Sequence, residues 1–146
     1  MSVMFDKSYH LLVNLTWRCT NKCKYCWEIL LGREEKKPPF EVAERSWEDW
    51  VRALNSLPPS VLDLSGGEPT IFNGFVNMMR ELHPKHALAL STNLQSDHGY
   101  RSLLNCSPNR LVSVTCSWHK HGRLEWQEFL ERAKNLKLLG FPVMIN

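Results

Sequence analysis

The sequence predicts an α/β protein with about five parallel strands and four helices in a single domain over residues 1–146. Short apolar segments alternate with longer segments whose apolar residues recur at helical spacing, which is the pattern of right-handed βαβ units. Polar residues follow each of the first four apolar segments. Because the carboxyl ends of parallel strands usually carry the chemistry, these residues are candidates for one site. The pattern does not separate a barrel-like sheet from an open one, so both arrangements stay open here.

The strands and helices follow one another in order along the chain. Residues 9–15 predict the first strand, and Ser46, with Asp49 three residues on, predicts a helix N-cap with an acidic first turn. Pro58 ends this helix, and residues 61–64 predict the second strand, which a Gly-Gly pair closes. The remaining expected elements are a helix over 75–82, a strand over 86–90, a weak helix over 102–105, a strand over 111–116, a long helix over 124–139 closed by Gly140, and a strand over 141–145.

The composition is that of an ordinary globular protein, with 43% hydrophobic and 23% charged residues. A net charge of +3 and a pI of about 8.6 neither demand nor exclude a phosphate-bearing partner. No segment approaches the roughly 18 apolar residues of a membrane span. Five cysteines, three of them crowded together, do not resemble a secreted disulfide framework, which favours a reducing, cytoplasmic location.

Three cysteines lie in one short segment, with the spacing Cys19-x3-Cys23-x2-Cys26. A metal centre that only holds structure usually takes four protein ligands. Three thiolates on one loop leave one coordination position open, and an open position is what substrate chemistry needs. The alternative is a zinc knuckle whose fourth ligand comes from a distant Cys or His. The spacing alone favours neither interpretation.

Together with a second motif, this segment resembles the radical S-adenosylmethionine (radical SAM) enzymes. The resemblance consists of the cysteine spacing, an aromatic residue, Tyr25, just before the third cysteine, and the run Gly66-Gly67-Glu68-Pro69 at a strand end about 40 residues later. It covers about residues 11–146. It implies a partial (β/α) TIM-like barrel of the radical SAM type, truncated here to about five strands and four helices.

The resemblance also implies two cofactors and a reaction. In this family the three cysteines hold three irons of a 4Fe–4S cluster, and S-adenosylmethionine binds the fourth iron. An electron from a donor such as flavodoxin or ferredoxin cleaves that cofactor, and the resulting 5′-deoxyadenosyl radical abstracts hydrogen from a substrate. The sequence names no substrate, although the segment Trp27–Phe40 is a candidate substrate lid.

The glycine motif is expected to bind S-adenosylmethionine, in a pocket that Tyr25 shares. Without side chains at Gly66 and Gly67, the backbone can approach the methionine part of the cofactor closely. Glu68 either accepts charge-assisted hydrogen bonds or braces the turn. The alternative is a tight turn after a buried strand. On the cofactor interpretation, Gly67→Val should spare the cluster and weaken cofactor binding.

The later strand ends supply three more candidates for cofactor binding, Ser91, Asn93 and Ser117. The run Ser91-Thr92-Asn93 resembles the Thr-Asn run that the family carries after its third strand, and its hydroxyl and amide groups suit the ribose or the carboxylate of the cofactor. The alternative is a polar strand terminus that caps the next turn. Ser117 follows the fourth strand, where the family often places a polar residue near the ribose.

Alternation along the fourth strand predicts two different faces. Ser113 and Thr115 share a face with Ser117, so hydroxyl groups should line the interior of a barrel. On the opposite face, Val112, Val114 and Cys116 should point toward the helices, which makes Cys116 a small buried hydrophobe.

Other residues with reactive side chains have two interpretations each. His119 and His121 follow the fourth strand and either contact substrate and transfer protons or belong to a solvated loop. Cys106 lies in an expected loop and is interpreted as structural or incidental.

The family core usually continues beyond a fifth strand, so the sequence predicts a truncated or minimal form with an open sheet edge. A bare edge exposes unpaired backbone groups, and a second copy or a partner chain is expected to cover it. Two functions compete with the enzyme: a zinc-binding module, and a degenerate homologue that keeps the cluster without turnover.

Overall fold

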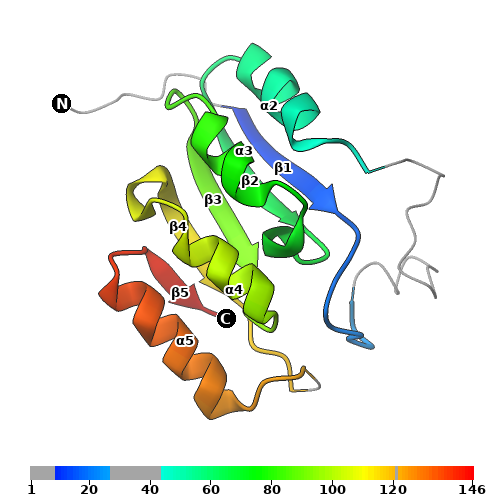
Figure 1. Cartoon of the computed structure of the whole chain (residues 1–146), viewed down its shortest axis with the longest axis vertical. Coiled ribbons are helices and arrows are strands. Elements are labelled where there is room, and N and C mark those ends of the chain that lie inside the picture. The colour runs from blue at the N-terminus through cyan, green and yellow to red at the C-terminus, as the bar shows by residue number, and fades with distance from the viewer. Residues whose placement is uncertain (1–8, 27–43, 121) are drawn as a thin grey trace.

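The computed structural model describes residues 9–26, 44–120 and 122–146. In these ranges five strands form one parallel sheet in the order β1-β2-β3-β4-β5 (Figure 1). The expected α/β fold with a parallel sheet is therefore confirmed. The strands are β1 (Tyr9–Thr16), β2 (Ser60–Gly66), β3 (Ala87–Thr92), β4 (Leu111–Cys116) and β5 (Val143–Ile145).

Four α-helices in the described ranges connect the strands, as the sequence predicts. Ser46 caps the first of them, because its Oγ accepts a hydrogen bond from the Asp49 N–H at 3.1 Å. No helix among them is both long and apolar enough to cross a bilayer. The helices are α2 (Trp47–Ser56), α3 (Phe75–Glu81), α4 (Asp97–Leu104) and α5 (Trp126–Leu138), with 3₁₀ turns at η1 (Pro69–Ile71) and η2 (Pro108–Arg110).

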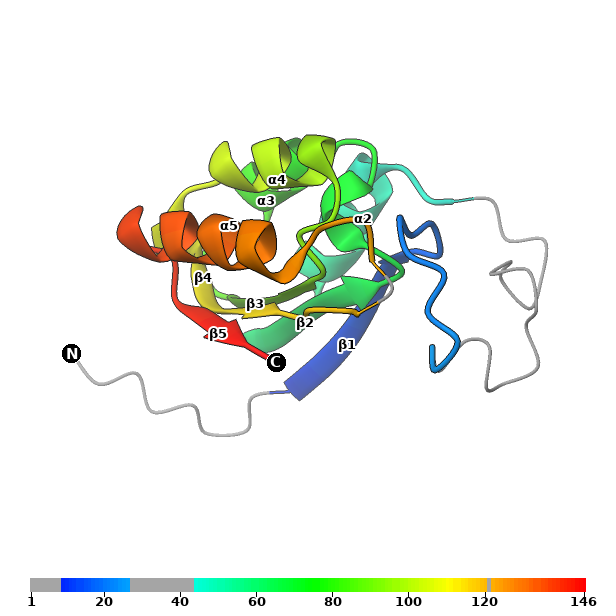
Figure 2. The ribbon, with the colours of Figure 1, turned by 90° about the horizontal axis from the view of Figure 1, so that it is seen from below.

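All four helices cover the same face of the sheet (Figure 2). Right-handed crossovers between strands in sequential order place every helix on one side, whereas a doubly wound sheet reverses its strand order partway. The sequential order is therefore that of a singly wound sheet rather than a doubly wound one, and β1 and β5 form the two edges of the sheet in the described residues. The structure fits a partial β/α fold.

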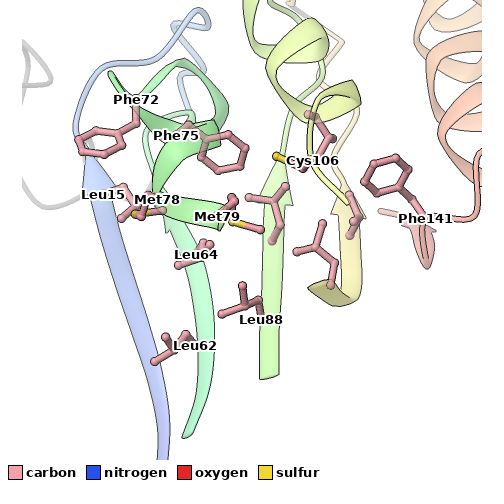
Figure 3. Packing of buried hydrophobic residues seen from close by; sticks show 14 of the residues in the cluster. Leu15, Leu62, Leu64, Phe72, Phe75, Met78, Met79, Leu88, Cys106 and Phe141 are labelled. Atoms are coloured by element: carbon pink, nitrogen blue, oxygen red, sulfur yellow. The ribbon is translucent and has the colours of Figure 1, made fainter. Parts of the chain in front are cut away.

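The hydrophobic core lies between the sheet and the helices (Figure 3). Leu62, Leu64 and Leu88 point from the strands toward the helices and are fully buried, as is Met78 on α3. The residues between them point to the helix-free face, because successive side chains of a strand alternate. One face of each strand thus supplies packing, and the other stays available for a ligand.

On the helix-free face, β3 and β4 carry small and polar side chains, whereas Leu12 on β1 and Met144 on β5 are exposed apolar residues of the same face. The strand register places Asp63 beside Ala89 and Ala89 beside Ser113, and it places Ser91 beside Thr115. The hydroxyl-lined face predicted for the fourth strand is thus present at Ser113 and Thr115.

Two local predictions are wrong. The third helix begins at Asp97 rather than near residue 102, because Ser96 caps it by accepting the Gly99 N–H at 3.1 Å. Val112 is 58% exposed rather than packed under the helices. The pairing of β3 with β4 passes from Leu111 directly to Ser113, so Val112 falls at an irregularity of the ladder.

Candidate functional site

A cavity of about 330 Å³ opens at the carboxyl ends of the strands. Its wall combines the cysteine segment after β1 with the ends of β2, β3 and β4. The structure brings all ten residues predicted for the cluster and the cofactor to this one cavity. The lining residues are Cys19, Asn21, Cys23, Tyr25, Cys26, Ser65, Gly66, Gly67, Glu68, Ser91, Thr92, Asn93, Ser117 and His119.

Backbone hydrogen bonds join the glycine motif to the end of β1 and to Arg18, the residue before Cys19. The Gly67 N–H donates to the Thr16 carbonyl at 2.7 Å, and the Glu68 N–H donates to the Arg18 carbonyl at 2.8 Å. A Cβ on Gly66 would lie 2.4 Å from the Thr16 oxygen, and a Cβ on Gly67 would lie 2.2 Å from the Arg18 oxygen. The glycines are therefore required for the close approach of the chain's own backbone.

This packing changes the expected effect of Gly67→Val. A side chain at Gly67 would displace Arg18, which directly precedes Cys19, and so would disturb the cysteine segment itself. Arg18 is also anchored from outside the cavity by an ion pair with Glu44 at 2.9 Å, and the Thr16 hydroxyl donates to the same carboxylate. The position of the cysteines thus depends on the glycine motif.

Glu68 is a buried carboxyl group, 1% exposed, that receives four hydrogen bonds. Thr70 donates its backbone N–H at 3.2 Å and its hydroxyl at 2.6 Å, the Thr92 hydroxyl donates at 2.8 Å, and the Asn93 N–H donates at 2.7 Å. Burial raises the pKa of the Glu68 carboxyl above its usual range, and these hydrogen bonds partly oppose the rise. Of the two roles open for Glu68, the contacts support bracing.

Asn93 lies between the end of β3 and the cysteine segment, and it is 5% exposed. Its Nδ2 is 3.5 Å from Cys19 Sγ, and its Oδ1 accepts the Gln95 N–H at 2.9 Å. Ser91 and Ser117 also line the cavity, and the Ser117 N–H donates to the Thr92 carbonyl at 2.9 Å. Two hydroxyls and one amide therefore approach the cavity from neighbouring strand ends.

The donor set of the cavity fits an iron–sulfur cluster. Cys23 is buried, Cys19 and Cys26 are half-buried, and the Asn21 N–H lies 3.4 Å from Cys19 Sγ. Thiolates that accept N–H hydrogen bonds are typical of such clusters, in which each sulfur binds a different iron. A single zinc ion instead needs ligands that converge on one point. The described residues, the three cysteines included, contain no group of three His, Cys, Asp or Glu that could hold one metal ion.

Tyr25 and His119 meet at the edge of the cavity. The Tyr25 hydroxyl is 2.9 Å from His119 Nδ1, and the two ring centres are 5.8 Å apart. The pKa of Tyr25 is raised by partial desolvation and by the neighbouring Cys23. The contact ties the cysteine segment to the end of β4, whereas His121 and the candidate lid Trp27–Phe40 lie outside the described residues.

The two remaining cysteines belong to the core, as predicted for Cys116. Cys116 is fully buried and Cys106 is 6% exposed. Burial raises the pKa of Cys106 to about 11 and that of Cys116 to about 12. Both thiols therefore stay protonated at neutral pH and act as small apolar side chains.

Several residues at the site lack an assignment from the sequence. Ser65 lines the cavity and occupies the polar face of β2, so the alternation argument used for the fourth strand would have found it. Gln95 accepts the Leu124 N–H on its Oε1 at 2.6 Å and so holds the segment after β4. No local pattern marks Gln95, because its partner lies 29 residues away.

Fold and cavity together define an α/β protein with a thiol-lined cavity at the carboxyl ends of a parallel sheet. No family model matches the chain.

Proposed function

We propose that this chain is a radical SAM enzyme built on a partial TIM-like barrel of that family's type. One observation carries the proposal. The cysteine triplet and the Gly-Gly-Glu motif line the same cavity, and two backbone hydrogen bonds join the motif to Thr16 and Arg18, just before the first cysteine. The cavity lies at the carboxyl ends of parallel strands, where β/α folds bind their ligands.

Each part of the cavity has a role in this proposal. When bound, a 4Fe–4S cluster and S-adenosylmethionine would supply the radical chemistry, which belongs to the cofactors rather than to the protein. Cys19, Cys23 and Cys26 would hold the cluster, and the hydroxyls of Ser91 and Ser117 offer polar contacts to the sugar of the cofactor. An electron donor such as flavodoxin or ferredoxin would supply the electron.

The proposal is tested by anaerobic reconstitution with iron and sulfide. We expect about one 4Fe–4S cluster per chain and, with dithionite, conversion of S-adenosylmethionine to 5′-deoxyadenosine and methionine. Cys23→Ala should abolish cluster binding, because a ligand is lost. Cys106→Ala is the matched control: it removes a buried thiol outside the cavity and should retain the cluster.

Three outcomes would contradict the proposal in different ways. One equivalent of zinc without iron would support the metal-binding module. A stable cluster without cofactor cleavage would indicate a degenerate homologue. Equal iron content in Cys23→Ala and Cys106→Ala would show that Cys23 does not hold the cluster.

A further inference from the structure

The loop that follows β3 has a backbone conformation that is unusual for its sequence. Leu94 has a φ of +55°, the only positive value among the described non-glycine residues. A β-carbon makes this conformation unfavourable, so it persists only where the surroundings impose it. Leu94 directly follows Asn93, and its side chain is 2% exposed. The surroundings of Leu94 therefore impose the bend.

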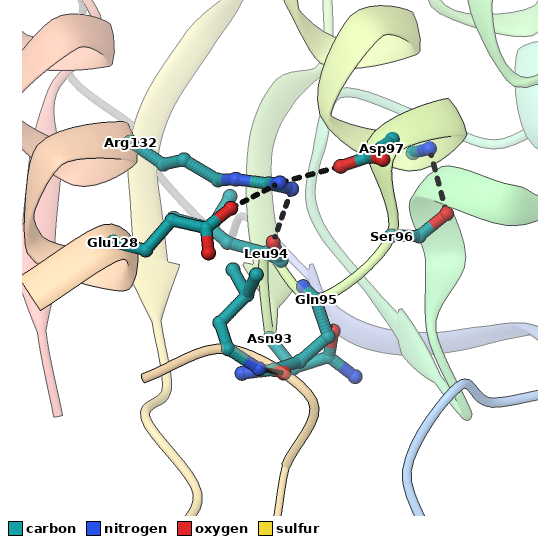
Figure 4. A network of polar contacts seen from close by, with 9 residues as sticks. Asn93, Leu94, Gln95, Ser96, Asp97, Glu128 and Arg132 are labelled. Carbon is teal, nitrogen blue, oxygen red and sulfur yellow. Dashed lines mark hydrogen bonds and ion pairs between the residues drawn. The ribbon is translucent and has the colours of Figure 1, made fainter. Parts of the chain in front are cut away.

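Arg132 on α5 holds this bend from outside the cavity (Figure 4). Its guanidinium donates to the Leu94 carbonyl at 3.0 Å and to carboxylates of Asp97 at 2.5 Å and Glu128 at 3.0 Å. It also lies 5.1 Å from the centre of the Tyr100 ring. With only 12% of its side chain exposed, Arg132 is held on several sides and is a fixed support for the loop.

The loop in turn fixes the amide of Asn93. Its backbone N–H is bound by Glu68, and its Oδ1 accepts the Gln95 N–H, so the oxygen must face Gln95 and the nitrogen must face the cavity. That nitrogen lies 3.5 Å from Cys19 Sγ. An amide donor thus faces the sulfur of Cys19, and the hydrogen bond from Gln95 sets which end of the amide does so.

We propose that Asn93 donates a hydrogen bond to the Cys19 thiolate and thereby raises the reduction potential of the bound cluster, and that Arg132 is the positioning residue that keeps Asn93 in place. Reduction adds negative charge that the thiolates share, so a donor at sulfur stabilises the reduced state more than the oxidised state. This inference rests on the proposed function. It gives Asn93 a hydrogen bond to the cluster ligand Cys19, in addition to any contact with S-adenosylmethionine.

The test is a redox titration of the reconstituted protein, monitored by EPR, with dithionite and mediators and without S-adenosylmethionine. Asn93→Ala should lower the midpoint potential by roughly a tenfold change in the one-electron equilibrium, which is about 59 mV. Asn93→Asp keeps the shape but replaces the donor with a negative charge, and should lower the potential further. Asn105→Ala, an exposed Asn at the end of α4, should leave it unchanged.

A double variant tests the role of Arg132. Arg132→Ala should lower the potential less than Asn93→Ala, and the two changes combined should lower it no further than Asn93→Ala alone, because Arg132 acts through Asn93. If Arg132 only stabilises the fold, Arg132→Ala leaves the potential unchanged and that assignment is overturned.

The possible failures are distinguishable. If the wild type binds no cluster, the proposed function fails, and this inference fails with it. If the wild type binds a cluster and Asn93→Ala has the same potential at equal iron content, only this inference is overturned. Should Asn93→Ala take up too little iron to titrate, Asn93→Asp decides: an unchanged potential in that variant also overturns the inference.

Discussion

The two ends of the sheet each bury an ionisable side chain, and they do so in opposite ways. At the carboxyl end, Glu68 is 1% exposed and receives four hydrogen bonds from three residues. At the amino end, His86 is 3% exposed, and neither of its ring nitrogens makes a hydrogen bond of normal geometry to the described residues.

The electrostatic consequences differ accordingly. Burial lowers the pKa of His86, and the neighbouring charges of Lys85 and His83 lower it further, while weak interactions with the backbone of Leu54 and Ser60 oppose this only in part. His86 is therefore held neutral, as a packing group. Burial raises the pKa of Glu68, but its hydrogen bonds tie together the loops that follow β2 and β3. Hydrogen bonding, more than burial, distinguishes the end that carries the cavity.

The largest effect is expected from removing the brace. Glu68→Ala leaves four buried donors without their acceptor, and we expect a loss of about 3–5 kcal/mol in the free energy of unfolding, measured by urea titration. His86→Leu leaves no donor unpaired, so its loss at pH 7.5 should be below about 1.5 kcal/mol. Equal losses in the two variants would contradict the distinction between the two ends.

A smaller effect is expected from a methyl group at the glycine motif. Gly67→Ala places a Cβ against the Arg18 carbonyl, and we expect a loss of about 1–3 kcal/mol together with reduced iron content after reconstitution. The matched control is Gly140→Ala at the amino end, where the nearest atom is 3.9 Å away and only the φ of +90° opposes a side chain. Gly140→Ala should lose about 1–2 kcal/mol and keep its iron. Full iron content in Gly67→Ala would show that the packing at Gly67 does not position the cysteines.

The smallest effect concerns the pH dependence of stability. Because the pKa of His86 is lower in the folded than in the unfolded protein, its contribution is present above the unfolded value of about 6.5 and is lost as the pH falls below it. The wild type should therefore lose stability relative to His86→Leu between pH 7.5 and 5, by about 1.4 kcal/mol for each unit of pKa difference. Parallel stability curves for the two proteins over that range would show that burial leaves the His86 pKa unshifted.

Most of the fold was predictable, because its signals are local. A strand such as Leu111–Cys116 and a cap such as Ser46 show in a few consecutive residues. The start of α4 escaped prediction because its first turns are polar and contain a glycine, so only the cap at Ser96 and the acidic Asp97 marked it. Val112 escaped because the irregularity that exposes it depends on the neighbouring strand.

The chain's own pattern of residues was sufficient for the α/β alternation, for the polar residues after each strand and for the cysteine spacing, since each depends on neighbours in sequence. Contacts between distant segments settled the rest. Asn93 and Cys19 lie 74 residues apart, and Arg132 and Leu94 lie 38 apart. The packing around Gly67 and the hydrogen bonds of Glu68 form only once the strands are paired, because each needs a partner from a distant segment. The same contacts set the orientation of these side chains.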